Sequence, residues 1–115
     1  MARILFVAVL LLTVVSAPPP PIRVVTGFGV GFAPASFQMR VTIPPHPDNR
    51  SACLTYDSGD YYRRSCWQVD EESAQSTWIW ARDVPAGEYL AVADLLRTTQ
   101  AIRSVPVPFR VLPRN

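Results

Sequence analysis

The sequence predicts an all-β protein: an antiparallel β-sandwich of about six or seven strands with one local disulfide, preceded by a signal peptide. Three observations predict this fold. Apolar and polar residues alternate over short runs, proline and glycine separate these runs, and no long stretch has helical periodicity. A chain of 115 residues has room for one domain with one core.

The first 17 residues have the layout of a signal peptide. Arg3 precedes an apolar run over residues 4–15, and the small residues Ser16 and Ala17 follow it. This run is shorter than the ~20 residues that a membrane-spanning helix needs. We therefore expect cleavage and a secreted or periplasmic protein, with membrane contact only through an uncleaved leader.

Residues 18–35 are expected to form a Pro/Gly-rich lead-in or edge strand, followed by the β-sandwich domain at 36–115. Four consecutive prolines over 18–21 favour an extended polyproline II segment. Glycine at every second position between 27 and 31 is typical of a flat, weakly specified strand.

The first clear strand begins at Phe37. One face is apolar and the other is polar, which predicts a half-buried strand whose inward residues are Phe37, Met39, Val41 and Ile43. A proline-rich turn over residues 44–50 ends this strand. Within that turn, Asn49 begins an Asn-Arg-Ser sequence that matches the N-glycosylation acceptor pattern.

Two short strands are expected at 52–57 and 64–69, with Cys53 on the first and Cys66 on the second. In an exported chain this pair is expected to form a disulfide, and closing a loop of about 12 residues stabilises the fold by about 3 kcal/mol.

The connection between these two strands is the candidate binding loop. It is rich in tyrosine and arginine, which are enriched at binding hot spots, and its residues are Tyr61, Tyr62, Arg63 and Arg64. The alternative is that one or both tyrosines fold back onto the core while the arginines are solvated.

The stretch from 78 to 97 predicts a strand, a turn and a second strand. Pro85 fixes φ at the start of the turn, and Gly87 is free to take a positive φ at its end. Tyr89 is expected to be structural, with a buried ring and a hydroxyl bonded to the backbone of residues 83–86.

The turn from Val84 to Tyr89 resembles the tyrosine corner of immunoglobulin-like and fibronectin type III-like β-sandwiches. The resemblance implies an immunoglobulin-like architecture and implies no activity. In antibody-type domains the disulfide joins distant strands of opposite sheets, whereas the cysteine pair of this chain is local.

Trp78 and Trp80 lie on one face of the strand before this turn, and we expect at least one of them to pack in the core. The strand after the turn is apolar on both faces, which predicts a central strand. Residues 91–100 alone also fit one or two helical turns. In the last run, Pro106 and Pro108 predict a strand with one unpaired edge.

Composition argues against several functions. The net charge of +2 is too small to suggest a nucleic-acid-binding protein. The single histidine, His46, lies in the proline-rich turn without a nucleophile motif, and the chain offers no metal-ligand spacing. We therefore expect no enzymatic activity, no catalytic residues, no cofactor and no metal site.

The expected function is that of a non-catalytic binding or structural accessory module, with a protein or cell-envelope component as its partner. A carbohydrate-binding or inhibitory module that uses exposed aromatic residues is the alternative. A small enzyme with an unrecognised carboxylate pair ranks third. Exposed coplanar tryptophans would favour the second reading, and a deep pocket with two close carboxylates would favour the third.

Overall fold

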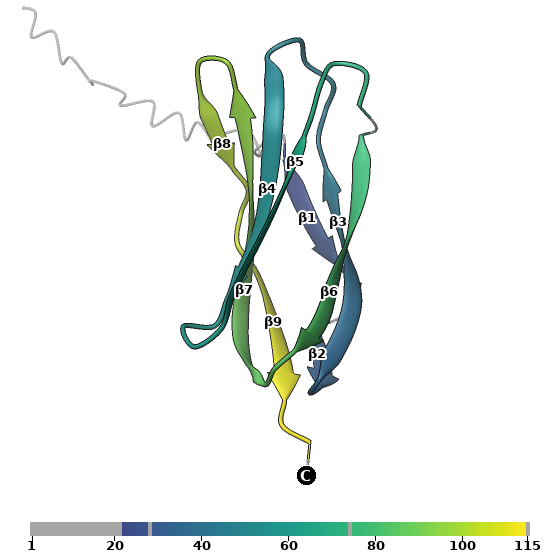
Figure 1. Cartoon of the computed structure of the whole chain (residues 1–115), viewed down its shortest axis with the longest axis vertical. Helices are drawn as coiled ribbons and strands as arrows, with labels where there is room; N and C mark the ends of the chain where they lie inside the picture. The colour runs from purple at the N-terminus through teal and green to yellow at the C-terminus, as the bar shows by residue number, and fades with distance from the viewer. Residues whose placement is uncertain (1–21, 28, 74, 115) are drawn as a thin grey trace, which may run out of the picture.

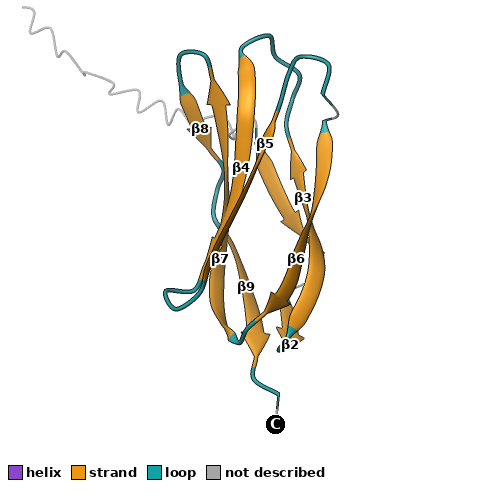
Figure 2. Ribbon diagram, viewed as in Figure 1, coloured by secondary structure: helices purple, strands orange, loops and turns teal. Residues whose placement is uncertain are grey.

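The computed structural model describes residues 22–27, 29–73 and 75–114. The predicted signal peptide at 1–17 and the prolines at 18–21 lie outside the described residues. Within them, Figure 2 shows strands joined by loops and turns. No helix among these residues is long and apolar enough to cross a membrane.

The strands form two sheets that pack face to face, as Figure 1 shows. The smaller sheet has the order β1–β3–β6, with bounds Arg23–Thr26, Ala35–Thr42 and Ser76–Val84. The larger sheet has the order β2–β9–β7–β4–β5, and β8 also pairs with β7. Its strands are β2 (Val30–Phe32), β4 (Asn49–Asp57), β5 (Tyr62–Gln68), β7 (Gly87–Arg97), β8 (Ala101–Arg103) and β9 (Val107–Leu112). The two-sheet all-β fold is thus confirmed.

The described residues form nine strands, more than the six or seven predicted. One reason is that the glycine-rich segment forms two short strands in different sheets. β1 pairs with β3 in the smaller sheet, and β2 pairs in parallel with β9 in the larger one. The chain therefore changes sheets around Gly27 and Gly29. The short β8 is the other strand that the pattern did not reveal.

The core lies between the sheets. The four residues predicted to point inward from the strand that begins near Phe37 are all buried, three in β3 and the fourth directly after it: Phe37, Met39, Val41 and Ile43. At the end of the sandwich near the β6–β7 turn, the ring of Phe109 stacks on Tyr89 at 4.9 Å between centroids and meets Phe37 edge-on at 5.1 Å. These aromatic contacts join the two sheets, because Phe37 belongs to the smaller sheet and Tyr89 to the larger.

Tyr89 is only 2% exposed, and its hydroxyl donates a hydrogen bond of 2.7 Å to the carbonyl of Pro85, within the predicted backbone segment. Gly87 does not use a positive φ as expected. Glycine at this position instead allows the backbone to pack closely against the β4–β5 loop, because a Cβ there would lie 3.1 Å from Cβ of Ser58. Asp83, with φ of 52°, takes the left-handed conformation near this turn.

The predicted disulfide is confirmed. Cys53 on β4 and Cys66 on β5 are directly opposite each other and are bonded. The bridge is local to one antiparallel pair, as the spacing of the cysteines indicated.

Two expectations about the C-terminal half need correction. Residues 91–97 belong to β7, so the helical alternative is wrong there. β9 pairs with β7 over residues 107–111, and its other edge pairs with β2 only over residues 110–112, so the predicted unpaired edge is confirmed beside Pro108 and wrong beyond it. The backbone N–H of Arg110 donates to the carbonyl of Gly29, on the side of β9 that faces β2. Pro108 is two residues earlier and faces the same side, but it lies before the residues that pair with β2, so its missing N–H removes no bond between these strands.

Asn49 of the glycosylation-like sequence is 1% exposed. Its side-chain amide donates to the carbonyl of Pro44 at 3.0 Å and accepts a bond from Nε of Arg97 at 3.1 Å. In the folded domain this side chain therefore has a structural role and is inaccessible to a modifying enzyme.

Candidate functional site

Three successive rungs of side chains face outward on the larger sheet, where β5, β4 and β7 are neighbours. Strand pairing brings the residues of each rung together, and those of β4 and β7 are distant in sequence. The rungs are Tyr62, Asp57 and Leu90; Arg64, Thr55 and Val92; and Cys66, Cys53, Asp94 and Arg103.

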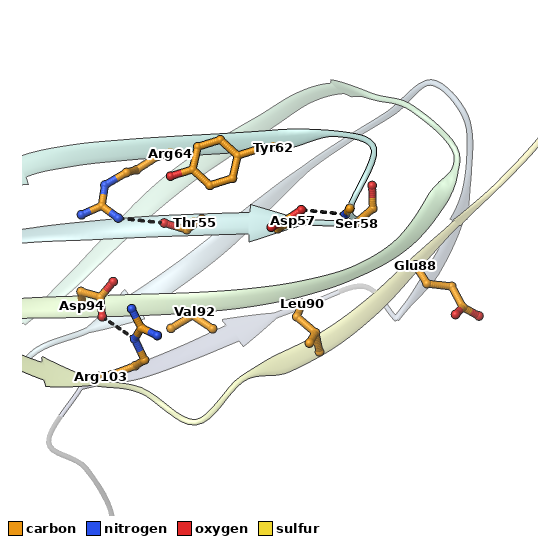
Figure 3. A pocket seen from close by; sticks show the side chains of 11 residues that line it. Thr55, Asp57, Ser58, Tyr62, Arg64, Glu88, Leu90, Val92, Asp94 and Arg103 are labelled. Atoms are coloured by element: carbon orange, nitrogen blue, oxygen red, sulfur yellow. Dashed lines mark hydrogen bonds and ion pairs between the residues drawn. The ribbon is translucent and has the colours of Figure 1, made fainter.

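An open groove of about 550 Å³ lies over these rungs. Figure 3 shows the side chains that line it, including Glu88 and Ser58 at the end nearest the β4–β5 loop. Its volume is within the ~300–1,000 Å³ of typical ligand clefts. The groove is therefore large enough for a small organic ligand.

The floor of the groove is apolar. Leu90 is 53% exposed although it lies in the middle of the sheet, and Val92 lies beside it two residues along β7. The ring of Tyr62 is 57% exposed and lines the groove from β5. The prediction that this strand is central is confirmed, because β7 lies between β9 and β4 in the larger sheet, but its outer face is open to solvent.

Charged groups stand around this floor. Nε of Arg103 donates to Oδ1 of Asp94 at 2.8 Å, and this hydrogen bond raises the pKa of Arg103 above its ordinary value. Oδ1 of Asp57 accepts a bond of 2.7 Å from the backbone N–H of Gly59. Arg64 makes only a long contact of 3.5 Å with Thr55 among the described residues, so most of its N–H donors remain available.

The predicted binding loop is divided by the fold. Tyr61 packs on the core, with its ring centroid 6.4 Å from that of Tyr56. Tyr62 and Arg64 line the groove. Arg63 pairs with Tyr56 on the other face of the sheet and lies outside the groove. The part that any of these residues takes in binding stays a prediction.

The sequence reasoning missed the contribution of β7 and β8 to this site. One face of β7 carries Glu88, Leu90, Val92 and Asp94. The two-residue period of a strand already placed these four side chains on the same face in the sequence. Because Leu90 and Val92 on this face are apolar, the strand was interpreted as apolar on both faces and no site was assigned to it. Arg103 was missed because its pairing with Asp94 depends on β8.

The expectation that Trp78 or Trp80 packs in the core is wrong. Both point outward from the smaller sheet, and they are 57% and 50% exposed. The inward positions of β6 between and after them are taken by Ile79, which is half-buried, and Ala81, which is fully buried. A second aromatic surface thus lies on the sheet opposite the groove.

Among the described residues, no group of three or more histidine, cysteine, aspartate or glutamate side chains is arranged to hold a metal ion. Both cysteines are joined in the disulfide. The candidate site therefore consists of an apolar floor, an aromatic wall and charged rims.

Comparison with protein-family models and with curated protein sequences gave no significant match. Among solved structures, the fold is similar to that of a superoxide reductase (neelaredoxin) from Ignicoccus hospitalis, with a TM-score of 0.60 and 15% identity. The similarity covers 78% of this chain and 79% of that chain. A match to an engineered protein, at 17% identity over 84% of this chain and 20% of that chain, has a TM-score of 0.46 and carries no argument.

This similarity corrects the prediction of a non-catalytic binding or structural module. That prediction is wrong as an inference from the fold, because an enzyme has a similar fold. At 15% identity the similarity shows the fold alone. Membership of the immunoglobulin-like or fibronectin type III-like families is not established by it.

Proposed function

We propose that the groove on the larger sheet is the functional site and that it binds a neutral oligosaccharide outside the cytoplasm. One observation carries the proposal: an exposed tyrosine ring and an exposed aliphatic floor lie in one cleft, surrounded by hydrogen-bond donors and acceptors. A sugar ring has the complementary surface, with apolar C–H faces and a perimeter of hydroxyl groups.

The apolar part of the groove supports stacking of a sugar ring. The Tyr62 ring and the Leu90 side chain are both more than half exposed, and Asp57 lies between them on the same rung. Burial of apolar area contributes roughly 25 cal/mol per Å². An aromatic ring adds a flat surface with little conformational freedom to lose on binding.

The polar rim supports recognition of hydroxyl groups. Carboxylates accept hydrogen bonds from hydroxyls, and guanidinium groups donate to them, with ionised partners giving the stronger bonds. The acceptors are Asp57, Glu88 and Asp94, and the donors are Arg64 and Arg103. Because these opposite charges nearly balance, the groove favours a neutral ligand over a strongly anionic or cationic one.

The walls of the groove are held in place before a ligand arrives. The disulfide lies one rung from Arg64 and joins β4 to β5, and the Asp94–Arg103 pair joins β7 to β8. Less conformational entropy is lost on binding when a site is ordered in advance.

The test is an array of neutral glycans probed with the full chain, followed by calorimetry on the best ligand. Tyr62→Ala should weaken binding at least about tenfold, as expected when an aromatic hot-spot residue is removed. Trp80→Ala on the opposite sheet is the matched control and should bind as wild type does. No bound neutral glycan, or equal affinity of the Tyr62→Ala variant, would refute the proposal.

The same incubation tests for catalysis, because chromatography of the glycan before and after contact with the protein detects any shortened product.

The activity in the name of the structural neighbour, superoxide reduction, is less well supported. Reduction of superoxide requires a redox centre, and the described residues offer neither a metal-ligand cluster nor a free thiol. We therefore do not transfer that activity to this chain.

A further inference from the structure

The outer face of the smaller sheet carries a second surface, the tryptophan–arginine face, which the proposed groove does not use. It consists of the outward side chains of β1, β3 and β6: Arg23, Val25, Gln38, Arg40, Trp78, Trp80 and Arg82. The two tryptophans are alternate residues of one strand, so their Cα atoms lie about 7 Å apart along it.

Each tryptophan is paired with an arginine. The guanidinium carbon of Arg40 lies 5.7 Å from the ring centroid of Trp78, directly across the β3–β6 pair. The guanidinium carbon of Arg82 lies 5.0 Å from the ring centroid of Trp80. These cation–π contacts hold the arginine side chains close to the sheet surface.

Stacking uses the face of a guanidinium group and leaves the N–H donors in its plane available. Neither Arg40 nor Arg82 makes an ion pair or a side-chain hydrogen bond with another described residue, and the same is true of Arg23. The donors of Arg40 and Arg82 are thus set beside aromatic rings and are free to bind carboxylate or sulfate groups.

The charges on the three strands of this face are mostly positive. Three arginines point outward, and the described carboxylate adjoining them is Asp83, in the bulge at the end of β6. Two half-exposed indole rings lie between these arginines, and exposed apolar surface of this kind is typical of a binding site. Flat rings and unpaired guanidinium groups together complement a polymer whose units each carry an apolar face and a negative charge.

We propose that the tryptophan–arginine face binds an acidic polysaccharide, with sugar rings packed against Trp78 and Trp80 and their carboxylates paired with Arg40 and Arg82. This ligand differs from the neutral oligosaccharide of the groove in charge and in place. A nucleic acid is the less favoured polyanion, because the whole chain has a net charge of only +2.

The experiment measures binding of the full chain to polygalacturonate by calorimetry. The matched ligand is the fully methyl-esterified polymer, which has the same backbone without the charges. To exclude binding in the groove, both polymers are compared with the Tyr62→Ala variant, which should bind the acid and not the ester, and added salt should weaken the binding. Arg40→Gln and Arg82→Gln should each lower affinity at least about tenfold through loss of a charge-assisted hydrogen bond.

Trp78→Ala and Trp80→Ala should lower affinity for the acid as well, whereas Tyr62→Ala in the groove should leave it unchanged. The arginine variants keep the test decisive if a tryptophan variant unfolds easily. Absence of binding to the acid, equal affinity for the ester, or equally tight binding of single-stranded DNA would overturn the proposal. Because its site, ligand and control variant differ from those of the groove, either proposal can fail while the other holds.

Discussion

Replacement of Tyr89 by phenylalanine isolates one hydrogen bond at the turn that joins the two sheets. The hydroxyl of Tyr89 donates to the carbonyl of Pro85 at 2.7 Å, and the side chain is 2% exposed. Phenylalanine keeps the ring that stacks on Phe109 and removes only the hydroxyl. The change in stability therefore reports the hydrogen bond with little change in packing.

The magnitude follows from what the variant leaves behind. A hydrogen bond contributes about 0.5–1.5 kcal/mol net, and a buried partner left unpaired costs about 1–3 kcal/mol. Pro85 is partly exposed, so water can reach its carbonyl in part and the lower range applies. We expect a loss of about 1–1.5 kcal/mol, which lowers Tm by about 4–12 °C in a domain of this size.

Thermal unfolding followed by circular dichroism measures this effect, with Tyr62→Phe as the matched control. Tyr62 is 57% exposed, so loss of its hydroxyl should change stability by less than about 0.5 kcal/mol. If Tyr89→Phe and Tyr62→Phe unfold at the same temperature as the wild type, the hydroxyl of Tyr89 does not stabilise the turn and the reasoning fails.

Three further predictions concern stability. Reduction of the Cys53–Cys66 disulfide should lower Tm by roughly 12–24 °C, since closing its loop stabilises the fold by about 3 kcal/mol; an unchanged midpoint would show that strand pairing alone holds the hairpin. Gly87→Ala should destabilise the fold by about 1 kcal/mol or more in urea unfolding, because its Cβ would lie 3.1 Å from a side-chain carbon of the β4–β5 loop. Gly29→Ala is the control, since a Cβ at Gly29 meets nothing within 4 Å. Burial raises the pKa of Tyr56 above 10.0, so the unfolded state loses this proton first and the free energy of unfolding should fall as pH rises above about 10; a constant free energy across that range, measured by urea titration, would contradict this.

Much of the fold could be predicted from the sequence because its signals are local. The alternation from Phe37 to Ile43 depends only on the period of a strand, and all four inward residues are buried. The disulfide joins residues of one hairpin, and the Tyr89–Pro85 bond spans four residues. Such features are determined by neighbours along the chain, so they can be recognised without knowledge of the sheets.

The candidate site depended on contacts between distant segments. Alternation shows that the two faces of a strand differ, but it does not say which face another sheet covers. Leu90 and Trp78 are both apolar, yet each lies exposed on the outer face of its sheet.

Register and sheet order likewise came only from the tertiary structure. Pairing of β4 with both β5 and β7 places Tyr62 and Leu90 on either side of Asp57, and β8 brings Arg103 to Asp94. The sequence by itself determined the strand period, the hairpin disulfide and the tyrosine turn. The tertiary structure decided which apolar faces stay open to solvent, because that depends on how two sheets, assembled from strands far apart in the chain, cover one another.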